Sequence, residues 1–467
     1  MYRIPTLLFI FLYSSLYLVF ASKAAEPFLH SNMRIIAYNV LAQPLATSKY
    51  FPYAHHNALK ASIRIPKLIE TIQQYSPDCL IISEGWKDFG LTLEKYGYTI
   101  DYAQRNNRQY GSIIAWNNKN WELITSARAE FNDLANIHIE ESIQYYQNRT
   151  SNTNTNSIST STTSSTTSIN IEDAARQIYR TDSLCQFVAL RRRALSSISV
   201  DAIPSSSTLN SSSLSSESPQ GIIISGAHLH WNPQEDHVKV AQAAMLLQLT
   251  SEFYNAYGLA NNYPCIIGGD MNSMPLSPAY HVFTHVPLPI LLSNSNHNSV
   301  PSSALDLVKE WNTKEQLTSS PSSSLSSPYL QRLELFVNEA ITIGRTTYQQ
   351  LQSAKKEKLN LSLQRNPDLY YCHSVYAEVN RQTNNLPLTY PSALLESSFT
   401  TCTATFTACI DYIFYIGKES NQNNNIINNK NIAVIPLPTI EEVKKDGNQG
   451  LPSLDHPSDH LLLGFSV

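Results

Sequence analysis

One pattern recurs at widely separated places in this chain: a run of apolar residues that ends directly in an acidic, amide or imidazole side chain. The six places are Tyr38-Asn39, Ser83-Glu84, the stretch from His228 to Gln242, Gly269 to Asn272, Ile410 to Tyr412 and Ser458 to His460. Short apolar runs of this kind are typical of buried strands, so each polar group follows the point where a strand ends. We expect these groups to gather at one mouth of a sheet, where carboxylates, amides and imidazoles together suit a hard divalent cation and a phosphate.

Strand-like runs outnumber helical stretches along the chain. We expect strands at Met33 to Leu41, Cys79 to Ser83, Ser112 to Trp116, Trp121 to Thr125, Cys185 to Leu190, Gly221 to His230, Tyr263 to Gly268, Ile410 to Ile416 and Leu461 to Val467. The third and fourth of these are expected to pair around a polar turn. Ala58 to Tyr75 and Asp236 to Tyr254 have helical periodicity, and Pro66 predicts a kink or a restart in the first. The excess of strands favours an α/β fold, a two-sheet α/β sandwich, over an alternating parallel barrel.

Four polar stretches interrupt this pattern. They are rich in Ser, Thr and Asn and lie at about residues 148–170, 196–219, 293–328 and 420–431. Such sequence buries too little apolar area to offset the entropy of ordering, so we expect disordered inserts. Because the polar strand-end groups are spread on both sides of the inserts, we expect one domain across residues 32–467.

The N-terminal residues have the pattern of a secretory signal peptide. Arg3 is followed by an apolar run from Ile4 to Phe20 and then by small residues that fit a cleavage site. We therefore expect residues 1–24 to be removed and the protein to be secreted, without stable association with a membrane. An uncleaved signal anchor is the alternative, since the run approaches spanning length. The sequons of a secreted glycoprotein would be Asn148, Asn210 and Asn360.

Cysteine placement and net charge limit the classes of site. None of the six cysteines forms a CxxC pair, which disfavours a structural zinc site. A disulfide among Cys372, Cys402 and Cys409 would fit an oxidising compartment. The formal net charge is -4, so no global basic field is available to hold a long nucleic acid duplex. A small anionic substrate in a local cation-bearing site is compatible with this charge.

Glu84, Asp270 and Asn272 have side chains suited to metal and phosphate chemistry. A carboxylate such as Glu84 at the end of a buried strand is costly to desolvate unless it is paired or bound to a metal. Asp270 and Asn272 are two residues apart, so on an extended segment their side chains point to one side. There Asp can orient or deprotonate water, and Asn can donate to a phosphate oxygen. Taken alone, each also fits an ordinary structural role.

Two histidines of the set have the setting of functional imidazoles. Asp459 precedes His460, which keeps the imidazole available as an acid or a cation, and Asp411 at another strand end can orient it. His228 and His230 alternate with apolar residues, so we expect both on one side of a strand. A lone His is more often a structural side chain, which is the alternative at each position.

In their order along the chain, these segments resemble the endonuclease/exonuclease/phosphatase superfamily of metal-dependent phosphodiesterases. Ile36 to Ala42 is similar to the first strand of one branch of it, which holds the carbon catabolite repression deadenylases, nocturnin, the Angel proteins and the 2′-phosphodiesterases. Further similar positions are Phe51 to Tyr53, Ala58 to Lys60, Arg64, and Gly226 to Pro233 with Lys239 and Gln242. The resemblance runs from about Met33 to the C-terminus, apart from the inserts.

The resemblance implies a role for each strand-end group. In the metal site, Glu84 would bind Mg²⁺, or Mn²⁺, with Asn39 beside it and Asp459 supporting the metal shell. The catalytic groups would be Asp270 on the attacking water, Asn272 on the scissile phosphate, His460 oriented by Asp411 on the developing charge, and His228 on a phosphate oxygen.

The resemblance also implies a substrate. Pro233 and Phe406 match positions that hold the substrate's base in the deadenylases, so we expect a secreted Mg²⁺-dependent phosphodiesterase or nuclease. The most specific expectation is a 3′-5′ exoribonuclease of the poly(A) type on single-stranded RNA. No leucine-rich repeat array precedes the domain, so a cytoplasmic deadenylase complex is not expected as a partner. The alternatives are a DNase or a lipid phosphodiesterase such as a sphingomyelinase with the same metal chemistry, and a non-catalytic binding glycoprotein on the same fold.

Overall fold

The structure is a computed structural model. It describes residues 33–132, 182–193, 220–288, 342–344, 346–350, 353, 365–387, 390–418 and 432–466. The expected signal peptide, the four expected inserts and the three sequons lie outside the described residues. Among the helices of the described part, none is both long and apolar enough to cross a membrane.

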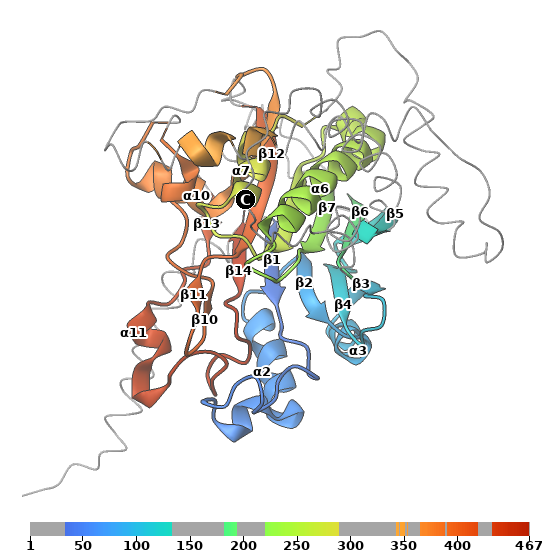
Figure 1. The fold of residues 1–467 in the computed structure, drawn as a ribbon. Helices are drawn as coiled ribbons and strands as arrows, with labels where there is room; N and C mark the ends of the chain where they lie inside the picture. The colour runs from blue at the N-terminus through green and yellow to red at the C-terminus, as the bar shows by residue number, and fades with distance from the viewer. Residues whose placement is uncertain are drawn as a thin grey trace, which may run out of the picture.

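Two six-stranded sheets form the centre of the described part of the chain (Figure 1). The first sheet has the order β13 (Ala433–Val434), β14 (Leu463–Ser466), β1 (Arg34–Asn39), β2 (Cys79–Gly85), β4 (Gly111–Asn117) and β3 (Tyr98–Gln104). The second has the order β5 (Trp121–Glu130), β6 (Leu184–Arg192), β7 (Gly221–His228), β8 (Cys265–Asp270), β12 (Asp411–Lys418) and β9 (Tyr370–Ser374). A separate hairpin pairs β10 (Thr401–Cys402) with β11 (Thr407–Ala408).

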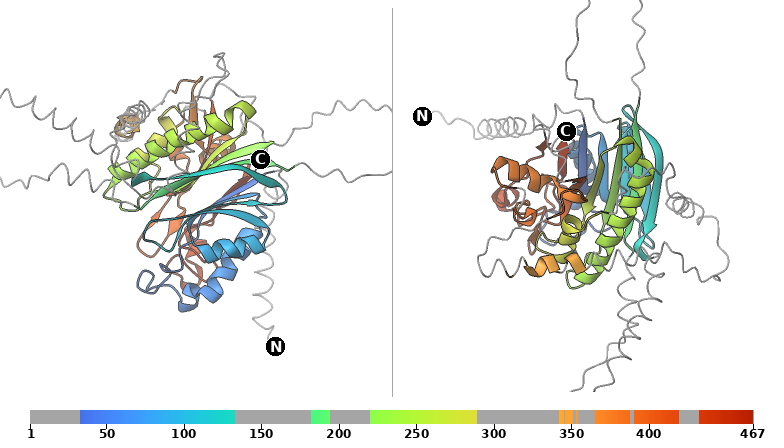
Figure 2. Two further views of the ribbon diagram at one scale, coloured as in Figure 1. Left: turned by 90° about the vertical axis from the view of Figure 1, so that its right-hand side faces the viewer. Right: turned by 90° about the horizontal axis from the view of Figure 1, so that it is seen from above.

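Helices cover the outer faces of both sheets, as the two views of Figure 2 show. The α-helices are α2 (Ala61–Gln73), α3 (Lys87–Lys95), α6 (Asp236–Tyr257), α7 (Pro278–His285), α10 (Val375–Thr383) and α11 (Ile440–Val443). Short 3-10 helices are η1 (His56–Leu59), η2 (Leu259–Asn261), η4 (Ser392–Leu394) and η5 (Lys445–Gly447). Helices α2 and α3 pack on the first sheet, and α6 and α7 pack on the second. This arrangement confirms the two-sheet α/β sandwich.

Alternation along the strands explains the layers. In β1, Ile35 and Ala37 face the second sheet, whereas Ile36 and Tyr38 face α2 and α3. Both sides of such a strand are buried, which accounts for its continuous apolar sequence. Gly268 lets the sheets approach closely, because a Cβ there would lie 2.7 Å from Cδ1 of Ile81 on the opposite sheet. The two sheets therefore enclose a closely packed apolar core.

The expected pairing of β4 with β5 is wrong. β4 pairs with β2 and β3 in the first sheet, whereas β5 crosses to the second sheet and pairs with β6. Asp78 holds the crossover, since its Oδ1 accepts from Asn120 Nδ2 at 3.0 Å and from Trp121 Nε1 at 3.2 Å. Both strands have the alternation of a hairpin, but Trp121 is fully buried and β5 has its partner in the other layer.

Helix α2 differs from its prediction at its start. The chain is extended at Lys60, between η1 and α2, and α2 then continues through Pro66 without a restart. The helix therefore begins after Lys60 and does not restart at Pro66. The disulfide expected among Cys372, Cys402 and Cys409 is not formed, because all six cysteines are buried free thiols.

Candidate active site

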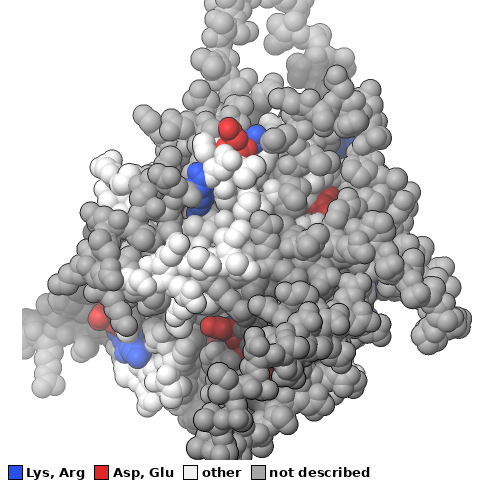
Figure 3. All heavy atoms as spheres, turned by 45° about the horizontal axis from the view of Figure 1, so that its top comes forward, with Lys and Arg blue, Asp and Glu red and all other residues white. Residues whose placement is uncertain are grey.

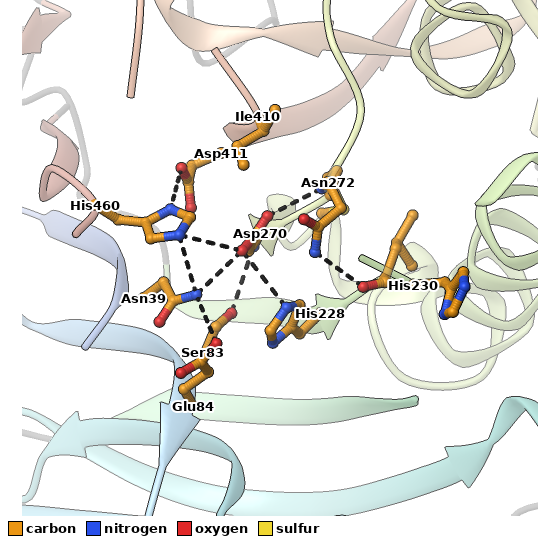
Figure 4. A network of polar contacts seen from close by, with 12 residues as sticks. Asn39, Ser83, Glu84, His228, His230, Asp270, Asn272, Ile410, Asp411 and His460 are labelled. Carbon is orange, nitrogen blue, oxygen red and sulfur yellow. Dashed lines mark hydrogen bonds and ion pairs between the residues drawn. The ribbon is translucent and has the colours of Figure 1, made fainter. Parts of the chain in front are cut away.

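The ends of five strands, and His460 just before β14, bring the predicted groups to one edge of the sandwich (Figure 4). Parallel β7 and β8 end together, with His228 opposite Asp270. Antiparallel β12 begins at the same edge, with Asp411 also opposite Asp270. In the other sheet β1 ends at Asn39 beside Ser83 of β2. Groups from both sheets thus converge on the Asp270 carboxylate.

The Asp270 carboxylate is the centre of the polar network. Its Oδ2 accepts from Asn39 Nδ2 at 3.0 Å and lies 3.5 Å from His228 Nε2 and 3.7 Å from His460 Nε2. Its Oδ1 accepts from the backbone N–H of Asn272 at 2.9 Å. Burial, followed by the negative charge of Asp411, raises the pKa of Asp270 to about 7, and the charge of His460 opposes this rise. A carboxylate with such a pKa suits proton transfer near neutral pH.

His460 and Asp411 form a buried pair. His460 Nδ1 donates to Asp411 Oδ2 at 2.8 Å, and the same oxygen accepts from Thr400 Oγ1 at 2.6 Å. Burial alone would lower the pKa of His460, but the carboxylates of Asp411, Asp459 and Asp270 outweigh it and hold the pKa well above its usual value. The imidazole is therefore a cation that is oriented by Asp411, with Nε2 facing Asp270.

Glu84 lies on the first sheet at the edge of the same cluster. A bulge between Ser83 and Gly85 and a left-handed backbone, with φ 58°, turn this residue out of β2. Its Oε2 accepts from the N–H of Ala42 at 2.9 Å, and its Oε1 lies 3.4 Å from Asn39 Nδ2. Burial, and next the charge of Asp459, raises the pKa of Glu84. A buried carboxylate whose ionisation is disfavoured by a neighbouring negative charge fits a divalent cation beside it.

Asn272 reaches the site by a different geometry from the one predicted. β8 ends at Asp270, and Asn272 has a left-handed backbone with φ 47°, so the two residues are not on one extended segment. The side chain of Asn272 donates through Nδ2 to the carbonyl of Leu229 at 3.0 Å. This bond ties the ends of β7 and β8 together, and Figure 4 shows Asn272 beside Asp270.

His228 and His230 have different partners. His228 faces Asp270, and burial, followed by the charges of Arg105 and His460, lowers its pKa well below the usual value, so it is neutral. His230 lies beyond the strand end and pairs instead with Glu235. The expectation that both face one side was wrong, because β7 stops at His228.

The remaining predicted residues lie at the rim. Asp459 is partly buried, and its Oδ2 is 4.0 Å from His460 Nε2. Pro233 is exposed on the loop after β7, and Phe406 is 47% exposed at the turn of the β10–β11 hairpin. That hairpin adjoins the site, since Thr401 pairs with His460 and donates through Oγ1 to the carbonyl of Asp459 at 2.8 Å.

Two separate sets of side chains are candidates for holding a metal ion, one found in the structure and one predicted from the sequence. Asp270, Asp411 and His460 offer ligand atoms that lie within 4.8 Å of one another, all of them buried. The other set is the predicted one, Glu84 and Asp459 with Asn39. In the first set a metal would compete with the bond between His460 and Asp411, whereas the oxygen donors of the second set suit a hard cation.

Two buried arginines support the site. Arg105 was missed from the sequence; its Nη2 donates to the carbonyl of His228 at 2.9 Å and to Ser183 Oγ at 3.0 Å. Arg64, noted above only as a point of resemblance, donates to the carbonyls of Val40 and Pro457. One signal was available for Arg64, because it interrupts the apolar face of α2. Arg105 has no comparable signal, since its partner is a backbone carbonyl far along the chain.

Several curated proteins are similar to this chain in sequence. Probable RNA exonuclease NGL3 of Saccharomyces cerevisiae is 22% identical over 261 residues, which cover 55% of this chain and 41% of that protein. Carbon catabolite repressor protein 4 homolog 4 of Arabidopsis thaliana is 24% identical over 280 residues, covering 58% and 60%. Protein angel homolog 2 of Homo sapiens is 21% identical over 453 residues, covering 92% and 68%. The chain spans about half the length of the first two relatives.

A solved structure of an Angel protein is also similar to this chain. A crystal structure of ANGEL2, a 2′,3′-cyclic phosphatase, in complex with adenosine-2′,3′-vanadate is 18% identical, with a TM-score of 0.48 and coverage of 93% of this chain and 95% of that one. No family model matches the chain.

Proposed function

We propose that this chain, which belongs to the endonuclease/exonuclease/phosphatase superfamily in the branch of the deadenylases, Angel proteins and nocturnin, hydrolyses phosphodiester bonds of single-stranded RNA with the help of a divalent cation. The observation that carries the proposal is the position of the Asp270 carboxylate. It lies between the amide of Asn39, the neutral imidazole of His228 and the cationic imidazole of His460. A base and charge-bearing donors are thus held a few ångströms apart.

Asp270 is the proposed base. Its pKa of about 7 allows it to accept a proton from water at neutral pH and to release it after the reaction. The N–H of Asn272 and the amide of Asn39 hold its two oxygens, so the carboxylate is fixed before a substrate arrives. Such preorganisation removes reorientation from the reaction step.

His460 is the proposed stabiliser of negative charge. Because Nδ1 of His460 donates to Asp411, Nε2–H is left to donate toward a phosphate oxygen at the mouth of the site. His228 is neutral, and its Nε2, which lies 3.5 Å from Asp270 Oδ2, is the proposed second donor toward the phosphate. Donors aimed at developing charge in a buried setting usually contribute most to catalysis.

Glu84 and Asp459 are the proposed ligands of the cation, with Asn39 beside them. The raised pKa of Glu84, caused first by burial and then by Asp459, fits a site whose negative charge a cation would balance. The oxygen donors favour Mg²⁺, and Mn²⁺ has similar preferences. A cation held there supplies positive charge to the scissile phosphate.

RNA is the proposed substrate because relatives of this chain are named as RNA exonucleases. Phe406 is half exposed on the hairpin that adjoins His460, where its ring is available to a terminal base. We propose that a base seated there places the last phosphodiester at Asp270, so that cleavage proceeds from the 3′ end. A preference for adenine would follow from the contacts that Phe406 and Pro233 make with that base.

Entry into the secretory pathway is part of the proposal. Its support is the sequence from Met1 to Ala24 alone. Expression of the full chain in eukaryotic cells, followed by N-terminal sequencing of protein recovered from the medium, tests it. A new N-terminus near residue 24 supports secretion; retention of all the protein inside cells contradicts it.

A panel of phosphodiesters tests the activity. Purified protein is incubated with oligo(A), oligo(A) ending in a 2′,3′-cyclic phosphate, single-stranded DNA and sphingomyelin, each with Mg²⁺ and with EDTA. We expect oligo(A) to be shortened from its 3′ end with Mg²⁺ and to be intact with EDTA. Cleavage that is unaffected by EDTA, or a preference for DNA or sphingomyelin, contradicts the proposal. Inertness toward all four supports a non-catalytic binding protein instead.

A further inference from the structure

We propose that Trp231 is an additional substrate-binding residue of this site, whose indole stacks on a nucleobase of the bound strand, with Met274 completing the apolar contact surface. This inference rests on the proposed function, because it names a base-binding position for the same substrate.

Trp231 is unusual among the tryptophans of the described residues. Its side chain is 69% exposed, whereas Trp86, Trp116 and Trp121 are at most 9% exposed. Met274 is 54% exposed. A large exposed aromatic side chain next to a site marks a surface that gains free energy when a ligand covers it.

Hydrogen bonds place both side chains beside Asp270. The N–H of Leu229 donates to the carbonyl of Asp270 at 3.0 Å, and Asn272 Nδ2 donates to the carbonyl of Leu229 at 3.0 Å. Trp231 follows Leu229 by two residues, and Met274 follows Asn272 by two residues. Since two residues of chain span at most about 7 Å, both exposed side chains start close to the reacting edge.

The loop that carries Trp231 is fixed on both sides of it. The N–H of His230 donates to Gln242 Oε1 at 2.8 Å, and the His230 imidazole pairs with Glu235. The N–H of Gln234 donates to Asn232 Oδ1 at 3.0 Å. The indole itself packs only loosely on His230, with the ring centroids 6.2 Å apart and the planes at 49°. A fixed backbone with an open aromatic face loses little conformational entropy when it binds a flat ring.

Charge supports a nucleobase as the occupant. The net charge of the chain is -4, and on the face of the molecule in Figure 3 the described Lys and Arg side chains are scattered rather than gathered into a basic stripe. Because the chain has no net positive charge, we infer that the bases supply much of the affinity for a strand. Stacking on an aromatic side chain is tolerant of sequence and does not need positive charge.

Tryptophan fluorescence tests the contact directly. Asp270→Asn protein, which is expected to hold the strand without cleaving it, is titrated with oligo(A) in Mg²⁺. We expect the emission to be quenched in a saturable way, and Asp270→Asn/Trp231→Phe to lose most of the quenching while it still binds oligo(A) in a filter assay. Quenching of equal size in both proteins overturns the inference.

Steady-state kinetics provide the second readout. Trp231→Ala is expected to raise KM for oligo(A) about tenfold, with kcat little changed. Trp231→Phe is expected to have a KM close to that of the native protein. On an oligonucleotide whose residues are abasic, Trp231→Ala and the native protein should have the same KM. Tyr96→Ala is the matched control, since Tyr96 is 54% exposed near the opposite edge of the first sheet, beside the start of β3.

The two proposals fail in different ways. If the native protein cleaves no RNA, the proposed function fails. If it cleaves RNA and Trp231→Ala leaves KM for oligo(A) unchanged, the activity stands and the stacking role of Trp231 is wrong. Trp231→Phe keeps an aromatic face at this position, so it separates the loss of stacking from a general loss of folding.

Discussion

Arg64 joins three separate segments beneath the site. It is 1% exposed, and its guanidinium donates to the carbonyls of Val40, Leu41 and Pro457. Burial lowers the pKa of Arg64 to about 10, while nearby acidic groups partly oppose the fall, so it is still charged at neutral pH. The segment after Asn39 and the one before Asp459 are therefore held in register by a single side chain.

Replacement of Arg64 by Met should destabilise the fold. Three buried carbonyls would lose their donor, at about 1 kcal/mol or more each, so we expect the free energy of unfolding to fall by about 3 kcal/mol or more. Urea denaturation followed by circular dichroism measures this change. Lys67→Met, at a partly exposed position one turn along α2, is the control and should be nearly neutral. Equal effects of the two substitutions would mean that the hydrogen bonds from Arg64 to these carbonyls do not stabilise the fold.

Asp411→Asn tests the orientation of His460. The amide cannot stabilise the imidazolium as the carboxylate does, so we expect kcat to fall about 10²- to 10³-fold while the fold is kept. Hydrolysis of oligo(A) is measured beside the melting temperature. Asp455→Asn, at an exposed position five residues before His460, serves as the control. An Asp411→Asn protein with native kcat would remove His460 from the proposed mechanism.

Strand β8 depends on a glycine just before Asp270. Gly269 has φ 135°, and a Cβ there would lie 2.0 Å from the carbonyl oxygen of Ala227 on β7. Only glycine lets the two strands pair while Asp270 turns into the site. The position of the carboxylate is thus set by backbone packing between neighbouring strands.

Gly269→Ala should separate β7 from β8. We expect a loss of about 3 kcal/mol or more in the free energy of unfolding, because backbone has to move to make room. Gly97→Ala is the matched control: Gly97 also has a positive φ, 88°, but a Cβ there meets nothing within 4 Å. Its cost should be only the backbone strain, about 1 kcal/mol. Urea denaturation of both variants compares them, and equal losses would mean that contact with Ala227 is unimportant.

Sequence patterns predicted most strands but not their partners. Apolar alternation marks a strand and says nothing of which sheet it joins, so β4 and β5 were assigned to one hairpin although they lie in different layers. Helices α3 and α10 have nine residues each, too few turns for a clear helical period. Helix α7 was not predicted although it had a usable signal, since Ser277 caps it and Pro278 opens it.

The stability of the whole domain should depend on pH through Glu396. Burial raises the pKa of this carboxyl to about 7 from 4.5, despite a hydrogen bond of 2.6 Å from the Tyr280 hydroxyl. Between these values the folded state keeps a proton that the unfolded state releases. The free energy of unfolding therefore falls as the pH rises from about 4.5 to 7, by an amount on the order of 2 kcal/mol.

Glu396→Gln should remove this dependence. We expect the variant to match the native protein near pH 5 and to be more stable near pH 8, because the amide is neutral at both. Urea denaturation at the two pH values measures the difference. Glu70→Gln, at an exposed position on α2, should change nothing at either pH. A constant difference between Glu396→Gln and the native protein would contradict the raised pKa.

Across the molecule, the sequence predicted which polar groups gather at the site but not the backbone geometry that positions each of them. Asn39, Glu84 and Asp270 follow apolar runs and His460 precedes one, so the sequence pattern is sufficient to locate all four at or near the ends of strands. The left-handed backbones of Glu84 and Asn272 leave no pattern in the sequence, because they are imposed by a bulge and by cross-strand hydrogen bonds. The roles assigned to these groups are predictions that kinetics must test.

The turnover rate of Asp270→Asn on oligo(A) in saturating Mg²⁺ is the most direct test of the account. Asn keeps the shape and the hydrogen bond from Asn272 but cannot accept a proton from water at neutral pH. We predict that kcat falls about 10³-fold, with a melting temperature equal to or above that of the native protein, since a buried carboxylate has been removed. A folded Asp270→Asn protein whose kcat lies within about tenfold of the native value would contradict the central role of this carboxylate.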